Sequence, residues 1–183
     1  MDILVIILLI LVILICVVFI IYTTNYNKFQ DYIIRINEVE SSIDTNLRNK
    51  YDLLSRSVSI IKSKDEELKN EAFDEIIKLR SRKISNFDLQ RKLVTAYNEL
   101  LSYKDTNKDI SKNEEINKII TDIESLNDRI DIEITYYNKN ISEYNKLISK
   151  FPYKIIALLN KYEEKLYFDR KDMSDDDYED FKL

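Results

Sequence analysis

Acidic side chains are the groups in this sequence that are best able to do chemistry. The 183 residues include 33 Asp and Glu but no His. The di-iron sites of helical bundles combine Glu with a Glu-x-x-His motif, so that site cannot form here. A Mg²⁺ or Mn²⁺ site built from carboxylates alone needs inward-facing acids on several helices. Glu40, with Asp44 one turn later, is the clearest candidate pair, and one pair is too few, so we expect no metal site.

Other catalytic groups are excluded by the residue types that the chain lacks. Without His it cannot form a Ser-His or Cys-His nucleophile pair, or a zinc site with His ligands. Cys16 is the single cysteine, so neither an intrachain disulfide nor a cysteine metal cluster is possible. There is no glycine to build a phosphate-binding loop. We therefore predict that the protein is not an enzyme, with no catalytic residue, no cofactor and no small-molecule substrate.

Tyrosine is the second residue type that suggests binding. Tyr136-Tyr137-Asn138 and Tyr144-Asn145 resemble surfaces that stack on nucleic-acid bases. However, Tyr137 and Tyr144 fall on an apolar stripe, and a net charge of -5 does not provide a basic surface, so we expect no nucleic acid. Tyr136 and Tyr153 are expected to be exposed. They form a possible partner surface, since tyrosine is favoured at protein interfaces.

The elements that carry these residues are expected to be all α-helical, because a chain with no glycine and one proline rarely forms tight hairpin turns. Residues 3–22 are all apolar or aromatic. Such a run of about 20 residues, at ~1.5 Å per residue, matches the ~30 Å hydrocarbon core of a bilayer. It predicts a transmembrane helix in contact with lipid. The alternative is a cleaved secretory signal, which is disfavoured because no Lys or Arg precedes the run and no small-x-small site follows it.

The charges that flank this run predict its orientation in the cell membrane. Lys28 and Arg35 follow it, whereas Asp2 precedes it. Because positive residues favour the cytoplasmic side, we expect a single-pass protein with its N-terminus outside and its body in the cytoplasm.

Two long apolar stripes follow, and each predicts a long helix packed against partners. The first comprises Tyr26, Phe29, Ile33, Ile36, Ile43, Leu47, Leu54, Val58 and Ile61. The second comprises Ile116, Ile120, Ile123, Ile130, Ile134, Tyr137, Ile141, Tyr144, Ile148 and Phe151. Asn127 alone interrupts the second stripe. Either it fixes the register between helices, or local rotation lets it reach water.

The region between the stripes is less regular. Residues 65–103 form either one bent helix or two helices, and in the second case Ser85, with Asp88 three positions later, would cap the new helix. Residues 104–113 are polar and are expected to form a loop.

The only proline, Pro152, predicts a corner. Proline ends the helix before it and suits the first position of the helix after it. The stripe of that closing helix is expected to be Ile155, Leu159, Tyr162 and Leu166. We favour a clasp folded onto the bundle over a basic amphipathic helix on the membrane surface. If residues 65–103 are one helix, up-and-down topology places the corner ~50 Å from the membrane helix, although a break at Ser85 would reverse this inference.

Several motifs have the order and spacing of one known family. At the C-terminal end they are Tyr137-Asn138, Tyr144-Asn145, Phe151-Pro152, Ile156-Ala157 and Tyr167-Phe168. Near the front they are Tyr26-Asn27, Glu40-Ser41-Ser42-Ile43-Asp44, Leu47 and Asp52-Leu53-Leu54. In this order they resemble the LemA family. The chain departs from the family at Ser55-Arg56, where the family has proline and asparagine.

The resemblance implies a membrane-anchored helical protein whose biochemical role is poorly defined, with no catalytic residue to carry over. The expected fold is an N-terminal transmembrane helix, then an antiparallel bundle of about four long helices with a short C-terminal closing helix. The expected parts are an anchor at residues 1–24, a LemA-like bundle at residues 25–168, and an acidic, disordered tail at residues 169–183.

For function, we expect a membrane-tethered interaction or scaffold protein that binds a protein partner. The alternatives are a structural coiled coil that oligomerises through its stripes and, less favoured, an enzyme that uses carboxylates and a metal ion. A stable monomeric body would indicate that the stripes are satisfied within one chain, and we expect a monomer.

Overall fold

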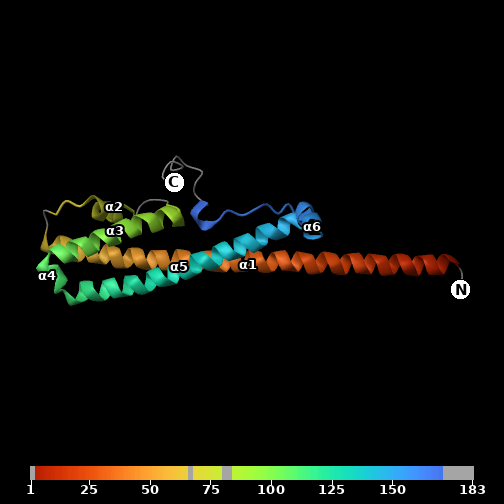
Figure 1. Ribbon diagram of the computed structural model, residues 1–183, viewed down its shortest axis with the longest axis horizontal. Coiled ribbons are helices and arrows are strands. Elements are labelled where there is room, and N and C mark those ends of the chain that lie inside the picture. The colour runs from red at the N-terminus through yellow and green to blue at the C-terminus, as the bar shows by residue number, and fades with distance from the viewer. Residues whose placement is uncertain (1–2, 66–67, 80–83, 171–183) are drawn as a thin grey trace. The chain divides into compact units, whose positions relative to one another are not determined.

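The computed structural model describes residues 3–65, 68–79 and 84–170 (Figure 1). Every regular element in these residues is a helix, which confirms the predicted all-α class. In chain order the elements are α1 (Ile3–Lys64), α2 (Glu71–Leu79), α3 (Asn86–Thr106), α4 (Lys108–Ser111), α5 (Glu114–Ser149), α6 (Tyr153–Asn160) and the 3₁₀ helix η1 (Phe168–Arg170). All but the first two residues of the predicted acidic tail lie outside the described residues.

The described residues fall into two compact units. The first takes its residues from Met1–Glu38 and Asn138–Tyr167, and the second from Val39–Tyr137 and Phe168–Leu183. Helices α1 and α5 contribute to both, so each unit contains a segment of α1 beside a segment of α5.

Helix α1 is a single helix of 62 residues. Its length is possible because no glycine or proline interrupts the sequence there. Its N-terminal part contains an 18-residue window of mean hydropathy 4.0, none of which is buried. It is the one helix in the described residues that is long and apolar enough to cross a membrane.

The two predicted stripes are largely confirmed. In α1 the side chains of Phe29, Ile36, Ile43, Leu47, Leu54, Val58 and Ile61 are buried. In α5 the same holds for Ile116, Ile120, Ile123, Ile130, Tyr137, Ile141 and Tyr144. Phe151 was expected to end the second stripe and is instead 82% exposed. Asn127 is half-buried, so its side chain retains access to water.

Polar contacts in the second unit show how its helices run. Ser42 of α1 bonds Glu133 of α5, and Arg56 of α1 pairs with Glu115 of α5. As the numbering rises along α1 it falls along α5, so these two segments are antiparallel. Tyr97 of α3 bonds Glu124 of α5, which attaches α3 to the same pair.

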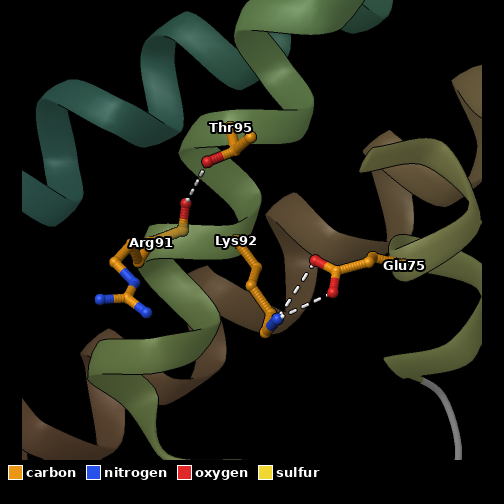
Figure 2. A network of polar contacts seen from close by, with 4 residues as sticks. All are labelled: Glu75, Arg91, Lys92 and Thr95. Atoms are coloured by element: carbon orange, nitrogen blue, oxygen red, sulfur yellow. Dashed lines mark hydrogen bonds and ion pairs between the residues drawn. The ribbon is translucent and has the colours of Figure 1, made fainter. Parts of the chain in front are cut away.

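Helix α2 packs on α3 through an ion pair shown in Figure 2. The Lys92 ammonium lies 3.2 and 3.1 Å from the two carboxylate oxygens of Glu75. On the same helix the Thr95 hydroxyl donates to the carbonyl of Arg91 at 3.2 Å. The described part of residues 65–103 contains α2 and most of α3. With only nine residues, α2 is shorter than the long helices that the bundle prediction required.

Asparagine and serine side chains cap the starts of α2, α3, α4 and α5 in this glycine-free chain. The Ser85 hydroxyl accepts from the amide of Asp88 at 3.1 Å, which confirms the predicted cap of α3. The Asn70, Asn107 and Asn113 side chains cap α2, α4 and α5 in the same way. The prediction of a loop at residues 104–113 is therefore wrong for most of its length. The Asn107 cap lets the polar run form α4 directly after α3.

The corner at Pro152 occurs as predicted, with small shifts. Helix α5 ends at Ser149, and Pro152 is the N-cap of α6 rather than its first residue. The predicted stripe of α6 is wrong, because the buried side chains are Ile156 and Ala157. Helix α6 ends at Asn160, and its C-cap Lys161, with a φ of 55°, fills the left-handed position that glycine usually takes.

Replacing Ser85 with alanine should lower the free energy of unfolding by about 1 kcal/mol, since the first turn of α3 loses its cap. Denaturant unfolding of the full chain in mild detergent, followed by circular dichroism, measures this. Ser102→Ala, at an exposed position within α3, is the matched control and should leave stability unchanged or slightly raised. Equal stability of the wild type and Ser85→Ala would show that the cap contributes nothing.

Candidate interaction surface

An aromatic cluster lies in the first unit, directly after the apolar run of α1. At its centre is Phe29, which is fully buried. Its ring centroid lies 5.8 Å from that of Tyr144 in α5, 6.1 Å from that of Tyr153 in α6 and 5.1 Å from that of Tyr162. Aromatic pairs at these separations add to the energy of burial. The cluster therefore fixes α6 and the segment after it against α1 and α5.

Polar atoms of the tyrosines face α1. The Gln30 amide donates to the Tyr162 hydroxyl at 2.7 Å, and the Lys28 ammonium lies 3.4 Å from the hydroxyl of Tyr153. Burial is the main cause that raises the pKa of both Tyr144 and Tyr162 above the ordinary tyrosine value. Both hydroxyls therefore stay protonated at physiological pH, and Tyr162 keeps its hydrogen bond from Gln30.

The same contacts place α6 beside the end of the apolar run of α1. Tyr153 begins α6 next to Lys28 and Phe29, and Asn160 ends α6 with its amide 3.4 Å from the hydroxyl of Tyr22. The corner therefore lies next to the apolar run and not ~50 Å from it. The ~50 Å expectation depended on residues 65–103 forming one helix. Because a new helix, α3, starts at the Ser85 cap, the reversed inference applies.

The two tyrosines predicted as a partner surface lie in different units. Tyr153 belongs to the first unit and is half-buried against Phe29. Tyr136 belongs to the second unit, on α5, and is 45% exposed. One turn before it, Ile132 is 70% exposed. Sequence reasoning missed Ile132 because it lies off the buried stripe, among charged neighbours.

A polar network crosses the α1 and α5 segments of the second unit. Glu133 of α5 accepts from the Ser42 hydroxyl at 2.6 Å and, through both carboxylate oxygens, from the Asn46 amide at 2.9 and 2.8 Å. Asn46 is 4% exposed. A buried amide of this kind needs its partner, so the network fixes the register of the two helices.

Lys50 is the buried cation of the second unit. Its side chain is 2% exposed, and its ammonium lies 6.0 Å from the ring centroid of Tyr97. Loss of hydration lowers the pKa of Lys50 to about 8, and the charge of Asp131 opposes this only in part. Burial, with the nearby Glu124 carboxylate, raises the pKa of Tyr97 to about 12. Lys50 is therefore protonated at pH 7 and Tyr97 is neutral.

A hollow of about 440 Å³ lies beside α2 in the second unit. Its lining is mostly charged and consists of Lys69, Asn70, Glu71, Asp74, Glu75, Lys78, Leu79 and Lys92. Two of its three carboxylates have cationic partners within the chain: Asp74 pairs with Lys62 and Glu75 with Lys92. The lining therefore resembles a solvated, self-paired surface rather than a binding site.

The candidate carboxylate pair does not converge on a metal position. Asp44 pairs with Arg48 at 2.8 Å on the exposed side of α1. Among residues 3–65, 68–79 and 84–170, no group of three or more His, Cys, Asp or Glu side chains is arranged to hold a metal ion.

Removing the Glu133 carboxylate should show how much the polar network contributes to the free energy of unfolding. Glu133→Ala leaves the buried Asn46 amide without its acceptor, so the free energy of unfolding should fall by about 1–3 kcal/mol. Denaturant unfolding in detergent measures the loss. The double variant Asn46→Leu with Glu133→Leu removes both partners and should recover most of it. Additive losses in the double variant would show that the two side chains do not depend on each other.

Lys50→Met should stabilise the protein at pH 7, on the order of 2 kcal/mol, since a depressed lysine pKa is an energetic cost of about 1.4 kcal/mol per unit. The wild type carries this cost fully below pH 8. Its stability should rise from pH 8 to about 10, where the folded lysine has lost its proton and the unfolded one retains it. The advantage of Lys50→Met should therefore shrink over that range, as measured by denaturant unfolding.

The pH series needs a control substitution, and its result does not depend on the ionisation of Tyr97. Lys118→Met, which removes an exposed lysine of α5, controls for the loss of a charge. Tyr97 is present in both proteins, so its ionisation cancels in their difference. An advantage of Lys50→Met that is the same at pH 7 and pH 10 would contradict the assignment of a desolvated ammonium.

Comparison with known proteins identifies the family. No curated protein matches the sequence. The model of the LemA family matches residues 39–179, which is most of the chain and includes the paired Tyr-Asn motifs and the Phe-Pro corner. The chain therefore belongs to the LemA family.

Proposed function

We propose that this protein is a single-pass membrane protein whose helical body binds a protein partner at the cytoplasmic face of the membrane. The observation that carries the membrane assignment is the exposure of the apolar part of α1. The large apolar residues among positions 3–21 expose between 39% and 78% of their surface. A core helix of a soluble protein would bury such side chains, and a bilayer would cover them.

The continuity of α1 supports an anchor that is retained and not cleaved. Helix α1 continues without a break from Ile3 to Lys64, so cleavage after the apolar run would cut a continuous helix. The packed part of the chain then begins within one or two turns of the lipid. The excess of basic residues after the run supports an outside N-terminus.

The partner surface is centred on Ile132 and Tyr136 of α5. They lie four positions apart and so share one face of the helix. Exposed charged residues flank them, among them Arg129 and Lys139. An apolar and aromatic centre with a charged rim is the composition of protein interfaces. The absent residue types, rather than any feature of this surface, argue that the role is binding and not catalysis.

Photo-crosslinking in native membranes tests this proposal. A photoreactive residue is placed at Ile132 or Tyr136, and a matched probe at Val94, which is exposed to 43% on α3. We expect one recurrent protein adduct from the two α5 probes and not from the control. Adding Ile132→Glu should reduce the Tyr136 adduct by about tenfold, the effect of ~1.4 kcal/mol of binding energy.

Two results would overturn the partner assignment. Adducts only to a second copy of the chain would make the protein a structural oligomer. Adducts to many proteins, equally from Val94 and Tyr136, would show that this face of α5 has no specific partner.

A further inference from the structure

We propose that α6 is a second membrane contact, in which the side chains of Leu158 and Leu159 enter the interfacial layer of the bilayer that α1 crosses. This inference rests on the proposed membrane span. It concerns a different part of the chain from the partner surface on α5.

The first observation is an apolar face that the described residues of the first unit leave exposed. Leu158 is 71% exposed, Leu159 68%, Ile155 50% and the preceding Phe151 82%. These positions are separated by four, three and one residues, which is the pattern of one helical face. Ile156 and Ala157 attach α6 to the rest of the unit and are 5% and 2% exposed. Clustered apolar exposure of this kind marks a binding surface.

The second observation is where this face lies along α1. The amide of Asn160 contacts the hydroxyl of Tyr22, the last residue of the apolar run. At the other end of α6, Tyr153 contacts Phe29 and Lys28. Helix α6 therefore runs antiparallel to this part of α1, and its C-terminal end lies level with the end of the apolar run.

The thickness of the bilayer layers and the rise of the helix indicate which side chains of α6 reach the lipid. The apolar run fills the hydrocarbon core, and beyond it lies an interfacial layer of roughly 5–7 Å on each side. Leu158 and Leu159 are within one turn of Asn160, or roughly 3 Å along the helix axis, and so lie in this layer. Phe151 is nine residues from Asn160, about 13 Å further from the core, and lies beyond it.

The charges near α6 allow an electrostatic contribution beside the apolar one. Lys150, Lys154 and Lys161 are exposed and Lys165 is half-buried, whereas Glu163 and Glu164 are the exposed acids of the segment that follows α6. The lysines outnumber the glutamates, so this region carries a net positive charge. A zwitterionic bilayer offers no net negative surface, and it therefore tests the apolar contact alone.

Depth-dependent fluorescence quenching of the full chain in phosphatidylcholine vesicles tests the inference. An environment-sensitive dye is attached to a single cysteine: native Cys16 in the anchor, Leu158→Cys, or Ile34→Cys, the last two in a Cys16→Ala background. Ile34 is the matched control, because it is an exposed apolar residue of α1 about 18 Å beyond Tyr22. Lipids that carry a nitroxide near the top of the acyl chain serve as the quencher.

We expect the dye at Leu158→Cys to be quenched about twofold or more relative to Ile34→Cys, because an interfacial helix buries its apolar face ~5–10 Å deep. The dye on Cys16 should be protected from water. If the Cys16 dye is in the bilayer while Leu158→Cys is quenched no more than Ile34→Cys, the inference fails and the membrane span stands. If the Cys16 dye remains in water, the span itself fails, and this inference fails with it.

Discussion

The uninterrupted helix α1 is the constraint on which the rest of the structure depends. With no glycine or proline along its length, it continues from a segment whose apolar side chains are all exposed into segments that bury a stripe. A single backbone thus presents two surfaces suited to different surroundings. Within each unit, the elements that pack on α1 can therefore be placed by the residues of α1 that they contact.

The contacts that α1 makes near its exposed apolar segment differ in kind from those it makes in the second unit. Next to the apolar run the contacts are aromatic and centre on Phe29, with tyrosine hydroxyls that reach polar side chains of α1. Rings with an apolar body and a polar tip suit the boundary between lipid and water. In the second unit the contacts include the buried Asn46 amide, which donates to Glu133, and the buried Lys50.

Glycine is absent, and its usual roles are carried by other residues. Helix starts use asparagine and serine side chains, so a short polar connection such as Asn107 can end α3 and begin α4 at one residue. The end of α6 uses Lys161 in the left-handed conformation, which is unfavourable for a residue with a β-carbon. The tight return after α6 brings Tyr162 back onto Phe29.

By itself the sequence determined the helical class, the apolar run, the two stripes, the Ser85 cap and the Pro152 corner, since each depends on local spacing or on one residue's backbone preference. It also determined which catalytic groups cannot exist. Only the tertiary structure decided which face of α6 is buried and where α6 lies. The helix has eight residues with several apolar positions, too few for a periodic pattern to indicate which of those positions are buried. It also decided that Glu133 meets Asn46 and that Ile132 stays exposed. Pairings between residues almost ninety positions apart depend on how the helices turn, and no local pattern records that.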